Sequence, residues 1–114
     1  MHELGVVFHM RDLLQEVAQE QGLTHIGKVV VDLGEVSGVV TDLFEDAWRW
    51  AADKTDLMHG AELQINLIPA VTVCNDCGKT YETVAHGRIC PHCGSAHTEL
   101  LRGRELEIRE IEAE

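Results

Sequence analysis

The chain has 114 residues, of which 45% are hydrophobic but only 4% aromatic, which allows one compact domain with a small appendage and a core of Val, Leu, Ile and Ala. Twenty acidic side chains against nine basic ones give a formal net charge of −11, which repels phosphate backbones and anionic membrane surfaces, so we expect neither nucleic acid nor membrane as a partner. The chain start lacks the pattern of a signal peptide and no apolar run approaches the roughly 18 residues of a membrane span, so we expect a cytoplasmic protein.

The first third of the chain predicts a helix followed by a strand. Apolar residues recur every three or four positions from residue 4 to 21, with acidic and amide side chains between them, and Gly22 is placed to end this helix. The run IGKVVVDLGEV that follows is rich in β-branched residues and alternates in polarity. It predicts a strand over about 26–36.

A second helix is predicted over 39–54. Ser37 or Thr41 can cap its N-terminus with a hydroxyl oxygen. Trp50 lies in the apolar stripe of this helix and is assigned to the core, whereas Trp48 is the better candidate for a contact surface.

The remaining regular elements are two strands on either side of a cysteine-rich stretch. The run ELQINLIP alternates in polarity and ends at Pro69, and the final ELEIREIE resumes a strand pattern. We expect these two strands to form a long antiparallel pair that carries the cysteine module at its tip. The predicted fold class is α+β: a three-stranded sheet with two helices on one face, plus a zinc-ribbon module inserted before the last strand.

The cysteine module contains the strongest motif. Two C-x-x-C pairs are separated by twelve residues, and a glycine follows each pair, where it eases a turn that points backbone amides at sulfur. Two such turns complete a tetrahedral shell of four thiolates that suits Zn²⁺, although iron would fit the same ligands. The predicted ligands are Cys74, Cys77, Cys90 and Cys93.

Other interpretations of the module are weaker. Disulfides are disfavoured because nothing suggests secretion, and a thioredoxin-type site needs only one pair near a βαβ unit. A zinc-ribbon module that binds protein or nucleic acid is the alternative function, but for nucleic acid the module offers only Lys79 and Arg88 as fixed cations and Tyr81 as a stacking ring. We do not expect an enzyme, since the four-thiolate shell leaves no position for a catalytic water and the sequence shows no nucleophile paired with a general base.

Three histidines lie in or beside the module: His86, His92 and His97. We interpret each as an exposed loop residue. Their nearness to thiolates also permits ligand exchange or a response to pH in the range where imidazole titrates.

The chain start MHE is a possible second metal site. His2 is bulky, so Met1 is expected to be retained, and the terminal amine, the amide nitrogen of His2 and its imidazole can form adjacent chelate rings. The amide of Glu3 is within reach of a fourth position, and its carboxylate can supply an oxygen ligand or a hydrogen bond to the imidazole. A plane of nitrogens suits Ni²⁺ or Cu²⁺. The alternative is a frayed end with an acidic residue near a helix N-terminus.

Taken together, these segments resemble the HypA family of hydrogenase nickel-incorporation proteins. The resemblance spans nearly the whole chain in the same order and rests on MHELGV, DLGEVSGV, LFEDAW, GAELQI, CNDCG, CPHCG and ELEIREIE. The zinc turns alone are unspecific, but their combination with an initial Met-His-Glu is specific.

The resemblance implies a nickel metallochaperone, not an enzyme, that helps load Ni(II) into the [NiFe]-hydrogenase large subunit and in some organisms into urease. It implies work with a HypB-type nickel GTPase, and contact with urease maturation proteins where urease is a recipient. It also implies nickel ligands at Met1, His2 and Glu3 and structural Zn(II) at the four cysteines. The expected domains are a nickel-binding part (1–70 and 98–114) and a zinc-binding part (71–97). Family members include monomers and homodimers, so the oligomeric state stays open.

Overall fold

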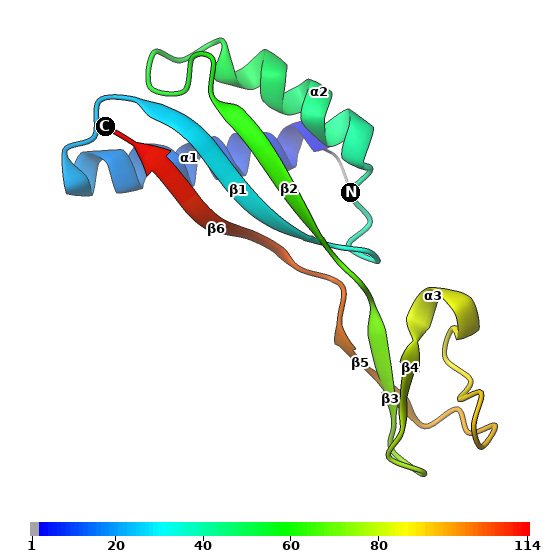
Figure 1. Cartoon of the computed structure of the whole chain (residues 1–114). Coiled ribbons are helices and arrows are strands. Elements are labelled where there is room, and N and C mark those ends of the chain that lie inside the picture. Colours follow the sequence, from blue (N-terminus) through cyan, green and yellow to red (C-terminus); the bar gives the residue numbers. More distant parts are fainter. Residues whose placement is uncertain (1–2) are drawn as a thin grey trace. The chain divides into compact units, whose positions relative to one another are not determined.

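The computed structural model describes residues 3–114 (Figure 1). The regular elements of this part of the chain, in order, are α1 (Glu3–Gln21), β1 (Ile26–Gly34), α2 (Thr41–Ala52), β2 (Glu62–Ile68), β3 (Val71–Cys74), β4 (Thr80–Glu82), α3 (Thr83–His86), β5 (Thr98–Arg102) and β6 (Leu106–Ala113). No helix among the described residues is long and apolar enough to cross a membrane.

The chain divides into two compact units. The sheet unit comprises the described part of Met1–Val31, together with Val39–Asn66 and Glu107–Glu114. The cysteine unit comprises Asp32–Gly38 and Leu67–Leu106. The division of the sequence into nickel-binding and zinc-binding domains stays a prediction.

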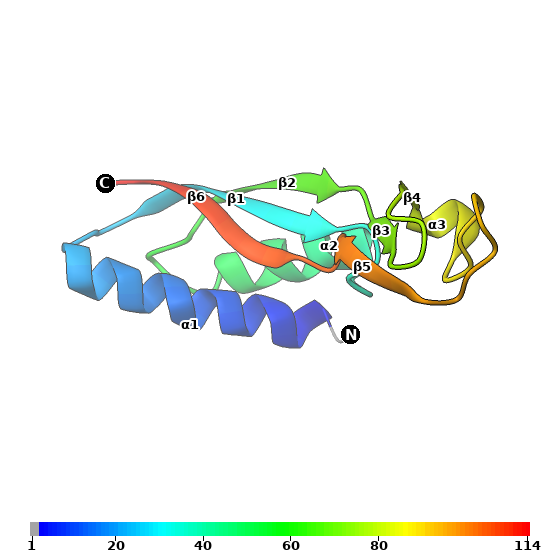
Figure 2. The same cartoon turned by 90° about the horizontal axis from the view of Figure 1, so that it is seen from below.

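A mixed three-stranded sheet forms the first of two sheets, in the order β2-β1-β6. Strand β6 runs antiparallel to β1, since the amide of Gly34 donates to Glu105 O (2.8 Å) and the amide of Glu114 donates to His25 O (2.9 Å). The arrows of β1 and β2 point the same way (Figure 2). The predicted fold class is therefore confirmed.

The expected pairing of β2 with the last strand is wrong, because β1 lies between them. The reason is the composition of β1. Val29, Val30 and Val31 are all buried, so both faces of this strand are covered and it takes the centre of the sheet. The predicted antiparallel pair around the module exists instead as β3 and β5, in a separate sheet ordered β4-β3-β5.

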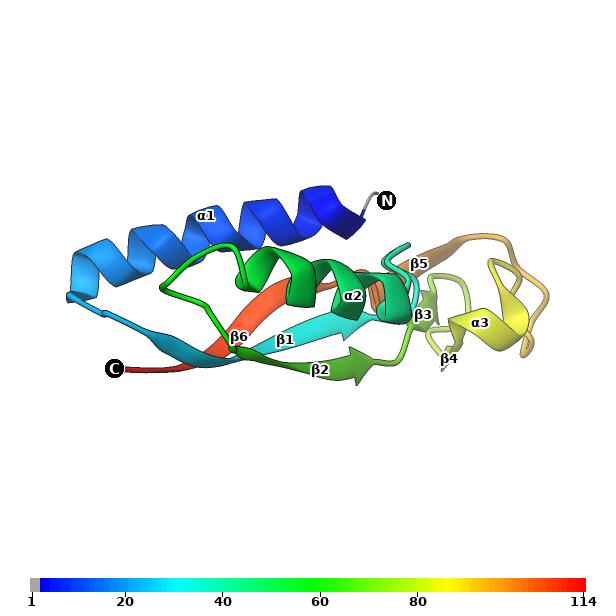
Figure 3. The same ribbon diagram turned by 90° about the horizontal axis from the view of Figure 1, so that it is seen from above.

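Helices α1 and α2 lie on the same face of the first sheet (Figures 2 and 3). Helix α1 buries a stripe that includes Val7, Met10 and Leu14. Helix α2 buries Phe44 and Trp48, and the indole Nε1 of Trp48 donates to Ala61 O at 3.0 Å. The core of the sheet unit therefore consists of aliphatic side chains packed together with the two aromatic rings of Phe44 and Trp48.

The two tryptophans have the opposite roles to those predicted. Trp48 is 3% exposed and Trp50 is 52% exposed. Helix α2 carries two apolar stripes, and the buried one follows Phe44 at steps of four, whereas Trp50 belongs to the outer stripe with Leu43. The Trp50 ring contacts the Phe8 ring at 6.2 Å between centroids.

The predicted hydroxyl cap of α2 is absent. The N-cap residue is Val40, without a side-chain cap bond, so neither Ser37 nor Thr41 serves this role. The carboxylate of Glu3 instead accepts a hydrogen bond from the Val40 amide at 3.1 Å. The first residue of α1 is thus tied to the start of α2.

Two glycines of the cysteine unit meet backbone to backbone. A Cβ on Gly34 would overlap the carbonyl of Gly103, and a Cβ on Gly103 would lie 2.5 Å from the Cα of Ala70. Gly103 also has a φ of +120°, which side-chain-bearing residues rarely adopt. The end of β1 and the segments next to β3 and β6 therefore approach without side chains between them.

Replacing Trp48 with Ala should lower the free energy of unfolding by about 3–5 kcal/mol, because a buried ring is lost together with its hydrogen bond to Ala61. Urea denaturation followed by circular dichroism measures the change. Trp50→Ala is the matched control and should cost less than about 1 kcal/mol, since its ring is half exposed. Equal losses in the two variants would contradict the assignment of Trp48 to the core.

Candidate metal centre

The second sheet holds two cysteine loops in place. In its antiparallel register, Thr72 of β3 pairs with Tyr81 of β4 on one side and with Leu100 of β5 on the other. One loop leaves β3 at Cys74 and returns as β4. The other lies between α3 and β5, so both loops are anchored by the same small sheet.

The two loops have the same backbone hydrogen bonds. In each, the amide of the first cysteine donates to the carbonyl five residues later, and its carbonyl accepts from the glycine four residues later. The distances are 2.9 Å (Cys74 to Lys79) and 2.8 Å (Gly78 to Cys74) in the first loop, and 2.9 Å (Cys90 to Ser95) and 2.8 Å (Gly94 to Cys90) in the second. Both glycines have positive φ, +75° and +78°, as predicted from the sequence.

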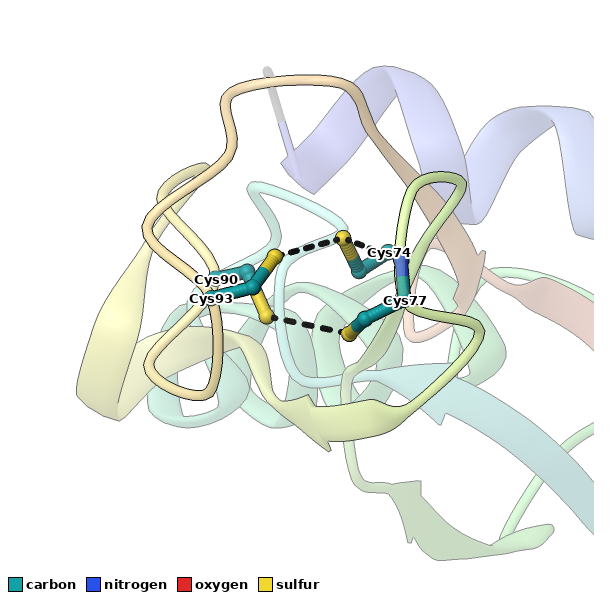
Figure 4. Close-up of side chains that lie close together, drawn as sticks. All are labelled: Cys74, Cys77, Cys90 and Cys93. Atoms are coloured by element: carbon teal, nitrogen blue, oxygen red, sulfur yellow. Dashed lines mark hydrogen bonds between the residues drawn. The ribbon is translucent and has the colours of Figure 1, made fainter.

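Four sulfur atoms converge between the loops (Figure 4). The Sγ atoms of Cys74 and Cys93 are 3.5 Å apart, those of Cys77 and Cys90 are 3.7 Å apart, and all four lie within 4.8 Å of one another. Four thiolates at about 2.3 Å from one Zn²⁺ would lie about 3.8 Å apart in a tetrahedron. The donor set and its spacing therefore fit a single tetrahedral metal ion, and all four cysteines are free thiols in the structure.

Backbone amides and neighbouring sulfurs act on these thiols. The Cys77 amide donates to the Cys74 sulfur at 3.5 Å, and this contact, together with a smaller effect of the Asp76 amide, lowers the pKa of Cys74 to about 7 against the opposing effect of burial. The Ser95 amide favours the Cys93 thiolate, but the Cys74 thiol and burial outweigh it and raise the pKa of Cys93 to about 12. Four thiolates at these distances repel one another, so full ionisation needs a cation at their centre.

A polar brace links the two loops on the solvent side. Ser95 Oγ donates to Asp76 Oδ2, the His97 amide donates to Ser95 Oγ at 3.0 Å, and the Asn75 amide donates to His97 O at 2.8 Å. The Ser95 hydroxyl, with a smaller effect from His97, holds the pKa of Asp76 below its usual value. This brace was not predicted, because nothing in the sequence indicates that Ser95 and Asp76 lie side by side. Only the folded loops bring them together.

The three histidines of the module are exposed, and none joins the sulfur cluster among the described residues. The His86 ring packs edge-on against Tyr81, with centroids 5.9 Å apart, and His97 Nδ1 lies 3.3 Å from Asp76 Oδ2. Tyr81 itself is buried, and its hydroxyl donates to Gly87 O at 2.9 Å. It is therefore not available as the stacking ring that a nucleic-acid interface would need.

The predicted nickel ligands are only partly within the structure. Met1 and His2 lie outside the described residues. Glu3 is the first residue of α1, and its carboxylate bonds to the Val40 amide.

Comparison with known proteins identifies the family. A family model described as "Hydrogenase/urease nickel incorporation, metallochaperone, hypA" matches residues 1–113. The chain belongs to the HypA family. The predicted function is thereby confirmed as that of a hydrogenase-maturation nickel metallochaperone with a four-cysteine, zinc-type site, and HypA proteins are maturation factors, not enzymes.

Individual relatives match along all or nearly all of their length. The chain is 32% identical to "Hydrogenase maturation factor HypA" of Aquifex aeolicus over 100% of this chain and 98% of the relative. It is 30% identical to "Hydrogenase maturation factor HybF" of Klebsiella pneumoniae over all of both chains. The solution structure of the Ni metallochaperone HypA from Helicobacter pylori is similar with a TM-score of 0.74 and 27% identity, over 99% of this chain and 97% of that one.

Substituting one ligand should disconnect the two cysteine loops. In Cys74→Ser, we expect zinc binding to weaken at least tenfold and the remaining thiols to react quickly with a thiol reagent, because a three-thiolate site binds less well. Fluorescence of Trp48 and Trp50, which both lie in the sheet unit, should stay unchanged. His92→Ala, next to two ligands but outside the cluster, is the control and should bind zinc normally. Full zinc binding by Cys74→Ser would contradict the site.

Zinc binding should also release protons in a pH-dependent amount. The pKa of about 7 at Cys74 means that this thiol loses its proton to solvent above neutrality, whereas Cys93, with a pKa of about 12, keeps its proton until a metal displaces it. Raising the pH from 6 to about 8 should therefore increase the apparent affinity and reduce the protons released per zinc. Calorimetry in buffers of different ionisation enthalpy measures this number. Proton release that is zero, or that rises with pH, would contradict the assignment.

Proposed function

We propose that this chain carries Ni(II) at a site formed by its amino terminus and uses a separate Zn(II) ion only for structure. The nickel ligands in this proposal are the terminal amine of Met1, the amide and imidazole nitrogens of His2, and the amide nitrogen of Glu3. The observation that carries the proposal is the HypA family match that begins at residue 1 and therefore includes Met-His-Glu.

The chemistry of the chain start supports nickel over zinc. An amine, an amide nitrogen and an imidazole in adjacent residues form fused chelate rings, and the resulting plane of nitrogens suits Ni²⁺, whereas Zn²⁺ prefers a tetrahedron. Binding through an amide nitrogen must expel a proton, so acid or a competing partner releases the metal. A carrier needs such reversibility.

Glu3 has a positioning role in this proposal. Its carboxylate is bound to the Val40 amide, which directs this side chain toward the start of α2. The residue thus fixes where the peptide chain enters α1, one residue after the imidazole. We expect the Glu3 backbone to be the closer participant in nickel binding, with the carboxylate holding it in place.

The zinc assignment rests on the closed donor set. Four thiolates fill all positions of a tetrahedral ion, so no position is left for water or substrate, and the ion stabilises loops that have little core of their own. The four proposed ligands are Cys74, Cys77, Cys90 and Cys93.

Delivery requires partners. By family resemblance these are a HypB-type nickel GTPase and the [NiFe]-hydrogenase large subunit in the cytoplasm, with urease maturation proteins where urease is also a recipient. The net charge of −11 supports docking to basic surfaces, because complementary charge accelerates association. The protein works in this proposal as a monomer or homodimer.

A calorimetric titration of the untagged, zinc-loaded chain with Ni²⁺ tests the nickel site. We expect one ion per chain, and loss of this binding in His2→Ala and in a variant with a Gly-Ser extension before Met1, since the first removes the imidazole and the second the amine. His9→Ala is the matched control, because His9 is an exposed histidine of α1. Zinc content and circular dichroism should be the same in all four proteins. Unchanged nickel affinity in both altered proteins would refute the proposal.

A further inference from the structure

We propose that the cysteine unit contains a second binding site, separate from the four sulfurs, that takes a small organic oxyanion between the side chains of Arg88 and Arg104. The site is a pocket of about 560 Å³ beside strands β3 and β5. It shares no residue with the sulfur cluster and lies entirely within the cysteine unit. The proposal is independent of the nickel function.

The first argument is charge. The chain has 20 acidic and nine basic side chains, yet both ionisable residues that line this pocket are arginines. Among the described residues, neither guanidinium forms an ion pair within 4.0 Å. Two guanidinium groups without a carboxylate partner leave charged N–H donors that a bound anion could accept from.

Two of the carboxylates that adjoin lining residues in the chain bind backbone amides. Glu105, next to Arg104 in the chain, accepts a hydrogen bond from the Gly103 amide. Glu35, next to the lining residue Val36, accepts one from the Ala70 amide at 2.9 Å. Because these carboxylates bind backbone amides and form no ion pair with Arg88 or Arg104, the guanidinium N–H groups stay available to a ligand.

The second argument is the hydroxyl lining. Thr72 Oγ1 and Thr83 Oγ1 lie 2.7 Å apart, and Thr72 is only 4% exposed. In such a pair one hydroxyl donates to the other, so the accepting hydroxyl retains a hydrogen that it can donate to a ligand. The pocket thus offers a ligand one hydroxyl donor in addition to the two guanidinium groups.

The wall that carries Arg88 is fixed before any ligand binds. Thr98 Oγ1 donates to Arg88 O at 2.7 Å, and the buried Tyr81 hydroxyl donates to Gly87 O at 2.9 Å. A preformed wall lowers the entropic cost of binding. Only the arginine side chains then need to order around the anion.

These features define the ligand class. Planar guanidinium groups bind carboxylate and phosphate through paired hydrogen bonds. The volume falls in the range of small-molecule pockets, about 300–1,000 Å³, and Val36 and Leu100 supply apolar surface. The ligand is therefore an organic anion that presents a phosphate or carboxylate group to the arginines and a less polar part to the rest of the pocket.

Titrations of the zinc-loaded full chain, followed by amide chemical shifts, test the site. The probes are phenyl phosphate, inorganic phosphate and citrate at about 150 mM NaCl, where long-range surface attraction is screened. We expect saturable binding with shifts at Thr83, Gly87 and Thr98. Arg88→Gln and Arg104→Gln should each weaken binding about tenfold or more, because each removes charge-assisted hydrogen bonds. Arg102→Gln, an exposed arginine of β5 outside the pocket, should change it less than about twofold.

The outcomes separate the possibilities. Saturation by the phosphates alone assigns a phosphoryl ligand, saturation by citrate alone assigns a carboxylate ligand, and either supports the site. Absence of saturable binding by all three probes overturns it, as do shifts confined to residues outside the pocket. Equal weakening by Arg102→Gln also overturns it, since that would indicate only general attraction to positive charge. The shifts in the unaltered chain decide the matter even if a variant fails to fold.

Discussion

The convergence of four sulfur atoms is the constraint on which the cysteine unit depends. Within 71–97 only Thr72, Cys74, Tyr81 and Cys90 are buried, and three of these four form a single cluster. So few buried side chains cannot offset the entropy of ordering such a segment. In the proposed zinc-loaded form, bonds from sulfur to metal take the place of a hydrophobic core. The strands, matched turns and polar brace are arranged so that the four thiols meet.

The sheet unit is held together differently. Its stability comes from the burial of aliphatic side chains of β1 and of the two helices. The indole of Trp48 is buried with them and donates a hydrogen bond to Ala61 O. This core needs no metal, so the two units have independent sources of order. In the proposed function, the nickel ligands belong to the chain start and the zinc ligands to the cysteine unit, so no residue serves both metals.

Much of this architecture could be predicted from the sequence, because its strongest signals are local. The period of α1, the β-branched run of β1 and the spacing of the cysteines each depend on nearby residues alone. The errors concern choices that only tertiary packing decides. The pattern of α2 contains two apolar stripes, and packing selects the one with Trp48. Likewise, the amide of Val40 at the start of α2 bonds to Glu3, 37 positions away, and the order of the strands depends on which one is apolar on both faces. The nickel ligands at residues 1 and 2 were inferred from chelate chemistry and resemblance and remain a proposal.

The contact between Gly34 and Gly103 has a genetic consequence. Every single-base change of a glycine codon that alters the amino acid introduces a residue with a Cβ atom, or else a stop. At these two positions any such atom collides with a backbone, which cannot rotate out of the way as a side chain can. Every such amino-acid change at either position therefore forces neighbouring backbone segments apart and should destabilise the cysteine unit.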